Sequence, residues 1–165
     1  MSSSGFWMKD KVLLTDIFSE LQRCDCGVVL LTGRSGCGKS CLLRQLQLSR
    51  EVKVCSIEEV METMIWGIKA GGARWVSDII GLFDGAEVAA VEDLDVNLRG
   101  KSYSQESLAH VLSLLGENVP VIITACQAEL TIPYFIDAIP GITIIRHISS
   151  EHQHLDLEGG IDYGV

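Results

Sequence analysis

The chain has 165 residues, which is enough for one compact α/β domain and too few for two of ordinary size. With 47% hydrophobic and 21% charged residues, it carries enough apolar surface to fold, and this composition excludes an intrinsically disordered chain. The 13 basic and 22 acidic side chains give a net charge of −9, which argues against a free-standing duplex-DNA binder because phosphates repel such a surface. No run approaches the ~18 apolar residues of a membrane span. The N-terminus also lacks a signal-peptide pattern, so we expect a cytoplasmic protein without membrane contact.

Six cysteines are spread along the chain, and their spacing does not suggest a disulfide framework. Cys24 and Cys26 could form half of a zinc site with His152 and His154, but no second close pair of cysteines completes it. We therefore expect buried or turn thiols and not a metal site.

Strand-like and helix-like segments alternate, which is the pattern of a parallel sheet covered by helices. Short continuous apolar runs predict strands buried on both faces, and apolar stripes at helical spacing predict helices. Ser56 and Glu59 form a capping box that starts one of these helices. In chain order we predict a helix over Lys9–Arg23, a strand over Gly27–Thr32, a helix over Lys39–Leu48, a strand over Val52–Cys55, helices over Ile57–Lys69 and Arg74–Phe83, a strand over Val88–Val91, a polar loop over Asp95–Ser104, a helix over Gln105–Leu115, a strand over Val121–Ala125, a short helix over Pro133–Ala138 and a strand over Ile142–His147.

The strongest chemical motif is the run GRSGCGKS, which matches the phosphate-loop pattern G-x-x-x-x-G-K-[ST] in full. It follows a predicted buried strand and opens a predicted helix, where backbone N–H groups and about half a positive charge meet phosphate oxygens. We expect Lys39 to bridge the β- and γ-phosphates and the Ser40 hydroxyl to hold Mg²⁺. The alternative is a Gly-rich turn with an exposed lysine. The predicted nucleotide-binding residues are Gly33, Arg34, Ser35, Gly36, Cys37, Gly38, Lys39, Ser40 and Cys41.

A second motif places Glu92 and Asp93 directly after four apolar residues, at the end of a predicted strand. A carboxylate there can reach Mg²⁺ through water, and its neighbour can orient the attacking water. We predict a magnesium site formed by Ser40, Glu92 and Asp93. A solvated acidic turn is the alternative, and Asp95 is a third candidate acid.

Thr124 lies at the end of the strand that should neighbour both the phosphate-loop strand and the acidic strand. Its hydroxyl could hydrogen-bond the γ-phosphate or the attacking water, although an ordinary β-branched strand residue is the alternative. The predicted catalytic set is therefore Lys39, Asp93 and Thr124.

Together these parts resemble the AAA+ ATPases, and among them the bacterial replication initiator DnaA and the helicase loaders. The likeness rests on a Walker A motif at Gly33–Ser40, a Walker B motif at Val88–Asp93 and a sensor position at Thr124. It also rests on two helices between the second and third predicted strands, where most AAA+ modules have one, and on the segment 92–106. The resemblance covers roughly residues 27 to 148.

The resemblance implies a three-layer α/β P-loop NTPase fold with a five-stranded parallel sheet in the order 5-1-4-3-2. It implies an AAA+-like ATPase core over residues 1–148, followed by an acidic, Gly-rich tail over residues 149–165. ATP or ADP with Mg²⁺ would be the cofactors. The family's lid and double-strand-reading domain would follow the last strand and are expected to be missing from this chain.

The sequence departs from the family pattern at two points. Glu92 stands where the initiators have Asp, and no Arg finger is found near Phe135–Ile139, because the next arginine is Arg146. These departures keep two functions open. One is an ATP-binding, weakly hydrolysing module of replication initiation or helicase loading that contacts a replication or mobile-element protein. The other is a nucleotide-responsive adaptor with little hydrolysis; a small phosphotransferase is a third reading.

The tip between the paired helices is the candidate contact with single-stranded DNA. Lys69 and Arg74 flank it and could meet a DNA backbone, but two solvated charges beside a turn are the favoured interpretation. Trp66 and Trp75 could stack on bases, although their helical spacing favours packing in the core.

Overall fold

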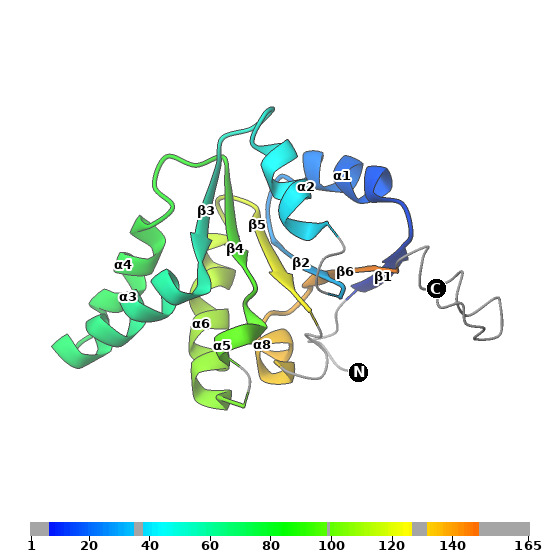
Figure 1. Cartoon of the computed structure of the whole chain (residues 1–165). Helices are drawn as coiled ribbons and strands as arrows, with labels where there is room; N and C mark the ends of the chain where they lie inside the picture. The colour runs from blue at the N-terminus through cyan, green and yellow to red at the C-terminus, as the bar shows by residue number, and fades with distance from the viewer. Residues whose placement is uncertain (1–6, 35–37, 99, 127–131, 149–165) are drawn as a thin grey trace.

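The computed structural model describes residues 7–34, 38–98, 100–126 and 132–148. Their strands form one six-stranded sheet in the order β1-β6-β2-β5-β4-β3, and every neighbouring pair is parallel (Figure 1). The strands are β1 (Trp7–Lys11), β2 (Val28–Thr32), β3 (Val52–Ser56), β4 (Val88–Glu92), β5 (Val121–Ala125) and β6 (Thr143–His147).

Helices cover both faces of the sheet, which gives three layers (Figure 1). On one face α1 and α2 bury apolar side chains against the strands, and on the other face α3 to α6 and α8 do so. The helices are α1 (Leu14–Gln22), α2 (Lys39–Leu46), α3 (Ile57–Ala70), α4 (Arg74–Gly81), α5 (Asp95–Leu98), α6 (Ser102–Leu115) and α8 (Pro133–Asp137).

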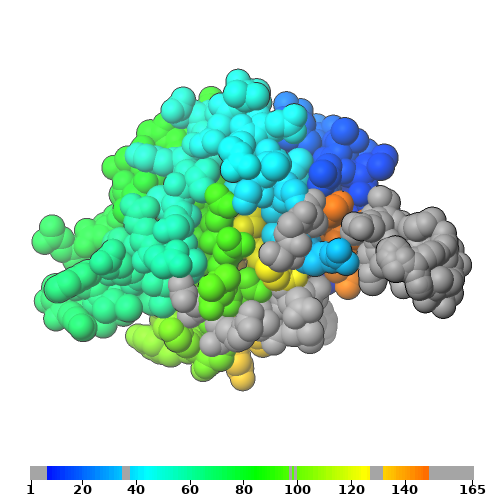
Figure 2. Space-filling view, viewed as in Figure 1, coloured from blue at the N-terminus to red at the C-terminus, as the bar shows by residue number. Residues whose placement is uncertain are grey.

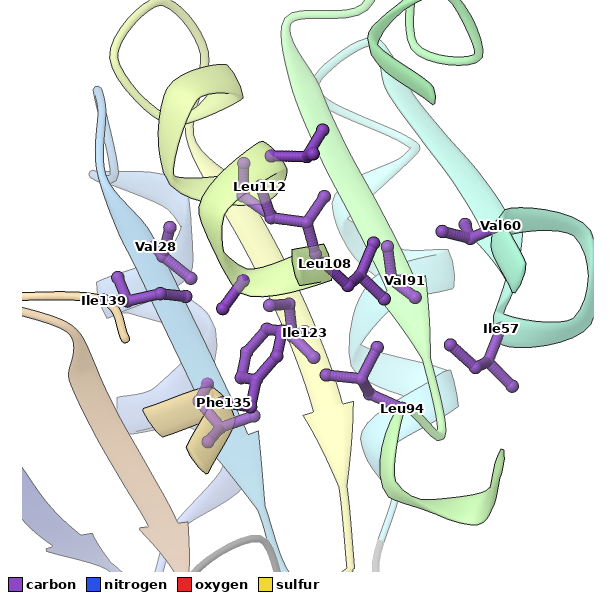
Figure 3. Close-up of a cluster of buried hydrophobic side chains, with 14 of the residues drawn as sticks. Val28, Ile57, Val60, Val91, Leu94, Leu108, Leu112, Ile123, Phe135 and Ile139 are labelled. Atoms are coloured by element: carbon purple, nitrogen blue, oxygen red, sulfur yellow. The ribbon is translucent and has the colours of Figure 1, made fainter. Parts of the chain in front are cut away.

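Strand β2 shows why the central strands have continuous apolar sequences. Its side chains alternate between the two faces, so Val28 and Leu30 join one core cluster while Val29 and Leu31 join the other. Figure 3 shows the first cluster, in which side chains of α6 and α8 meet those of β2, β4 and β5; its labelled members there include Val28, Val91, Leu108, Leu112, Ile123 and Phe135.

The predicted helix over Lys9–Arg23 is wrong at its start, where the chain forms the edge strand β1. The Trp7 amide donates to the Ile142 carbonyl at 3.0 Å, and the Ile148 amide donates to the Lys11 carbonyl at 2.7 Å. The five-stranded prediction is therefore corrected to six strands, because β1 extends the sheet beyond β6. The other five strands follow the order β6-β2-β5-β4-β3, which matches 5-1-4-3-2 when β1 is left out.

Ion pairs hold β1 against its neighbours on both sides of the sheet. Glu20 of α1 pairs with Lys9 and with Lys11, and Arg146 of β6 donates two hydrogen bonds to Asp10 at 2.9 and 3.0 Å. The hydrogen bond from Arg146 lowers the pKa of Asp10. For Glu20, burial acts to raise the pKa, but the hydrogen bonds and charges of both lysines together hold it below its ordinary value.

We expect strand β1 to loosen in acid. Because the pKa values of Asp10 and Glu20 are lower in the folded chain, their contribution is present above the unfolded values near ~4 and is lost as the pH falls through the folded values. These ion pairs are solvent-screened, so the effect is a few-fold in the amide protection of β1, measured by hydrogen exchange at pH 6 and pH 3. The variant Asp10→Asn should already show part of the loss at pH 6, and β1 protection that stays constant to pH 3 would contradict this account.

The predicted polar loop over Asp95–Ser104 is wrong in part, because residues 95–98 form α5 and α6 begins at Ser102. Leu94 and Leu98 are fully buried, and a helical turn brings both side chains to the core. The predicted helix start at Ser56 is confirmed: its hydroxyl accepts the Glu59 amide at 3.1 Å.

Helices α3 and α4 form the predicted pair and project from one side of the molecule (Figures 1 and 2). They meet at Gly67, where a Cβ atom would lie 2.1 Å from the Cβ of Trp75. Trp75 packs against the core, as predicted. Trp66 is 67% exposed on the outer face, so its predicted core packing is wrong; a helix has only one face toward its partner, and Gly67 occupies it.

A methyl group at Gly67 should force the two helices apart. We expect Gly67→Ala to lower the free energy of unfolding by about 2 kcal/mol, because the new Cβ collides with the Cβ and Cα of Trp75 and not with a flexible chain end. Gly81→Ala in α4 is the matched control: nothing lies within 4 Å of its Cβ position, so helix propensity should raise stability by about 0.5 kcal/mol. Urea denaturation measures both, and equal effects of the two substitutions would contradict the close helix contact.

Candidate functional site

The candidate site lies where β2, β4 and β5 end, because parallel neighbours bring their carboxyl ends to one edge of the sheet. The structure describes six of the nine predicted nucleotide-binding residues. Ser35, Gly36 and Cys37 lie outside the described residues. Of the others, Arg34 and Cys41 are exposed, and Gly33 is buried at the end of β2.

Lys39 is the most buried charged residue of the loop, at 7% exposure. Its Nζ donates to the carbonyl of Gly33 at 2.6 Å and to that of Arg34 at 3.1 Å, so the ammonium group lies against the backbone that follows β2. Gly38 has φ 104°, a conformation that L side chains rarely adopt, and a Cβ there would also lie 3.2 Å from Leu14. The structure therefore explains both residues: Gly38 adopts a backbone conformation that favours glycine, and Lys39 places its ammonium group beside two backbone carbonyls.

Two of the three residues predicted to hold magnesium, Ser40 and Glu92, are in direct contact. Ser40 Oγ, in the first turn of α2, donates to Oε1 of Glu92 at the end of β4 at 2.7 Å. A hydroxyl and a carboxylate are oxygen ligands of the kind that Mg²⁺ prefers. Among the described residues no group of three His, Cys, Asp or Glu side chains could hold a metal, so a site here would depend on phosphate and water oxygens for its other ligands.

Asp93 and Thr124 are also brought together. Asp93 is exposed and has φ 56°, the positive-φ conformation that is unusual for a residue other than glycine. Its amide donates to Thr124 Oγ1 at 2.8 Å, and the next amide, of Leu94, donates to the Thr124 carbonyl at 2.9 Å. The Thr124 hydroxyl keeps its own proton for a further acceptor, so its predicted contact with phosphate or water stays a prediction.

Asp95 and Gln105 have structural roles that sequence reasoning missed. Asp95 is 1% exposed, and its carboxylate accepts the Cys126 amide at 3.1 and 3.3 Å. Gln105 is equally buried; its amide nitrogen donates to the Leu98 carbonyl, and its oxygen accepts amides of α8. The sequence signal for both is only a polar residue within an apolar segment.

The remaining candidate residues lie apart from this edge of the sheet or outside the described chain. Lys69 and Arg74 are exposed; the Lys69 Nζ is 5.9 Å from the ring centre of Trp66, and Arg74 lies 3.7 Å from Asp78. Arg146 lies in β6 and is paired with Asp10.

The described cysteines do not form a metal site. Burial raises the pKa of Cys24, and burial with nearby Glu59 raises the pKa of Cys55 to about 11, so both thiols stay protonated near neutral pH. Cys26 is exposed, and no metal-binding group of side chains includes it within the described ranges. His152 and His154 lie outside the described residues.

The strand order, the helix α2 that follows β2 and the acidic end of β4 make this an α/β fold that is consistent with a P-loop NTPase-like core. The DnaA-like fold inferred from the motifs is confirmed by solved structures. Domain III of the Thermotoga maritima replication initiation protein DnaA superposes with a TM-score of 0.57 and 16% identity over 88% of this chain and 67% of that one. DnaA from Aquifex aeolicus bound to AMPPCP gives 0.56 and 14% identity over 87% and 49%.

A third structure is the replication initiator DnaA bound to AMPPCP and single-stranded DNA, with a TM-score of 0.54 and 14% identity over 91% of this chain and 51% of that one. This chain thus spans about half the length of the initiators it matches. No family model and no curated protein matches its sequence. Within the described ranges, none of the helices has the length and apolar character needed to cross a bilayer.

Proposed function

We propose that this chain binds ATP with Mg²⁺ at the loop before α2 and hydrolyses it slowly, as a DnaA-like module of replication initiation or helicase loading. The observation that carries the proposal is the contact between Ser40 and Glu92, which joins the phosphate loop to the acidic strand through two oxygen ligands. A Gly-rich turn that binds no ligand would not require a hydrogen bond between Ser40 and Glu92.

Four residues of the site have a defined task in this proposal. The Lys39 ammonium, buried beside two loop carbonyls, balances the charge of the β- and γ-phosphates. Ser40 and Glu92 would hold Mg²⁺, which when bound neutralises charge on the phosphate oxygens. Asp93, exposed at the turn after β4, orients the attacking water and accepts its proton.

The compared proteins add the biological setting. Two of them are initiators bound to AMPPCP, and one also holds single-stranded DNA. For this chain we place a DNA contact at the exposed end of α3, where Lys69 and Trp66 offer a cation and an aromatic face, with Arg74 at the start of α4.

A nucleotide-responsive adaptor is the second candidate, and two observations favour it. The longer Glu92 stands at the metal position, and α8 carries no arginine that could act on a neighbouring subunit. An adaptor would bind ATP or ADP and use the difference between them to control a protein contact.

Turnover measurements separate these functions. We would follow phosphate release from ATP by the chain alone, with single-stranded DNA, and with candidate replication proteins. Slow basal turnover that DNA increases supports the module of replication, whereas binding without turnover under all three conditions supports the adaptor. Transfer of the γ-phosphate to a metabolite would favour a phosphotransferase instead.

A further inference from the structure

The end of β5 forms hydrogen bonds on one side with the phosphate loop and on the other side with the turn after β4 (residues 93–95), which we call the acidic turn. Toward the loop, the Gly33 amide donates to the Ala125 carbonyl at 3.2 Å, and Thr32 Oγ1 donates to the Cys126 carbonyl at 3.1 Å. Toward the acidic turn, Thr124 accepts two successive amides, as described above. A displacement of β5 would therefore change the positions of both the phosphate loop and the acidic turn.

Asp95 adds the contact that holds this junction from the acidic side. Both oxygens of its carboxylate lie within 3.3 Å of the Cys126 amide nitrogen, which donates to them. Burial of a carboxylate is costly unless hydrogen bonds compensate it, and a bond to an ionised acceptor is stronger than one between neutral groups. Residues 93, 94 and 95 thus all bind the last residues of β5 and the residue that follows it.

The turn at Asp93 needs such support. A positive φ in a residue with a side chain is strained, and it persists only where the surroundings hold it. The Thr124 hydroxyl holds the Asp93 amide itself, and Asp95 fixes the strand end that presents this hydroxyl.

We propose that Asp95 is a positioning residue of the phosphate site: by holding the Cys126 amide it fixes the end of β5, and thereby the Thr124 hydroxyl that keeps the Asp93 backbone in its turned conformation. This inference rests on the proposed function, in which Asp93 orients the attacking water. It assigns Asp95, the third candidate acid, to the geometry of the turn and not to the metal.

The test combines amide hydrogen exchange, nucleotide affinity and turnover, first in two variants of Asp95. Asp95→Ala should increase exchange of the Cys126 and Asp93 amides about tenfold and reduce kcat by a similar factor, because a bond to a charged acceptor is lost. The affinity for a fluorescent ATP analogue should change less than ~3-fold, since the contacts of Lys39 are untouched. Asp95→Asn keeps an oxygen that can accept the same amide, so it should restore most of the protection and of kcat.

Two further variants keep the result decisive. If Asp95→Ala does not fold, Asp95→Glu retains the charge and displaces the carboxylate by one methylene, and it should still lower kcat at unchanged affinity. Asp137→Ala, at an exposed carboxylate of α8, is the matched control and should leave amide exchange, nucleotide affinity and kcat unchanged.

Unchanged exchange at Asp93 in Asp95→Ala, or an affinity loss as large as the loss of kcat, would overturn the proposal. A wild-type chain without any turnover would refute the proposed hydrolysis instead, and the exchange of the Asp93 amide would then decide the role of Asp95 by itself.

Discussion

Replacing Lys39 with alanine should weaken ATP binding by about 100-fold or more, equivalent to about 2.7 kcal/mol. The Lys39 ammonium is buried and lies within hydrogen-bond distance of two loop carbonyls, so in the complex it would provide a charge-assisted contact that bulk water screens little. Truncation removes this contact and leaves the backbone amides and Mg²⁺ to balance the charge of the phosphates. The dissociation constant for a fluorescent ATP analogue measures the loss.

The control for this variant is Lys101→Ala, which removes an exposed lysine before α6 and leaves the phosphate loop intact. Its affinity should stay within ~2-fold of wild type, because a single distant surface charge contributes little to binding at physiological salt. Circular dichroism and the unfolding midpoint of both variants must match the wild type. A correctly folded Lys39→Ala chain with full affinity would show that the loop is not the phosphate site.

The second large effect is expected for Asp93→Asn, which should abolish turnover while leaving ATP affinity nearly unchanged. Asparagine tolerates positive φ as well as aspartate does, so the turn and its bond to Thr124 should survive. The amide cannot accept a proton from water, and the loss of a general base lowers the rate by about 100-fold or more. Single-turnover phosphate release, measured beside the dissociation constant, separates the two effects.

Asp93→Ala makes the comparison sharper. It removes the same carboxylate but also the side chain that tolerates the turn, so it should lower turnover and destabilise the fold together, whereas Asp93→Asn should affect turnover alone. Equal turnover in Asp93→Asn and in the wild type would move the role of base to another group.

The central strands could be predicted because their signals are local. The apolar run that forms β2 has to be buried on both faces. Gly38 is likewise explained locally, because its positive φ favours glycine, whereas phosphate binding by the loop stays a prediction. Strand β1 has no such signal: its residues are mostly charged or exposed, and their strand conformation depends on pairing with β6, more than 130 residues further along the chain. The helical stripe of α1 therefore predicts, wrongly, a helix that already begins within β1.

The parts of the site that were not predicted depend on tertiary contacts. Nothing in the sequence indicates that Asp95 faces the Cys126 amide, or that Gln105 connects α5 with α8, because both contacts join segments about 30 residues apart. Trp66 and Trp75 have similar neighbours in sequence, yet only Trp75 lies where α4 crosses α3. Hydrophobic spacing identifies the faces of a helix, but not which one its partner covers.

A calorimetric titration with ATP, ADP and AMP in the presence of Mg²⁺ tests the central claim most directly. A loop that holds the β- and γ-phosphates should bind ATP and ADP at one site per chain, and AMP about 100-fold more weakly, because AMP lacks the groups that Lys39 and Ser40 contact. Equal affinity for AMP and ATP, or no binding of any adenine or guanine triphosphate, would contradict the account.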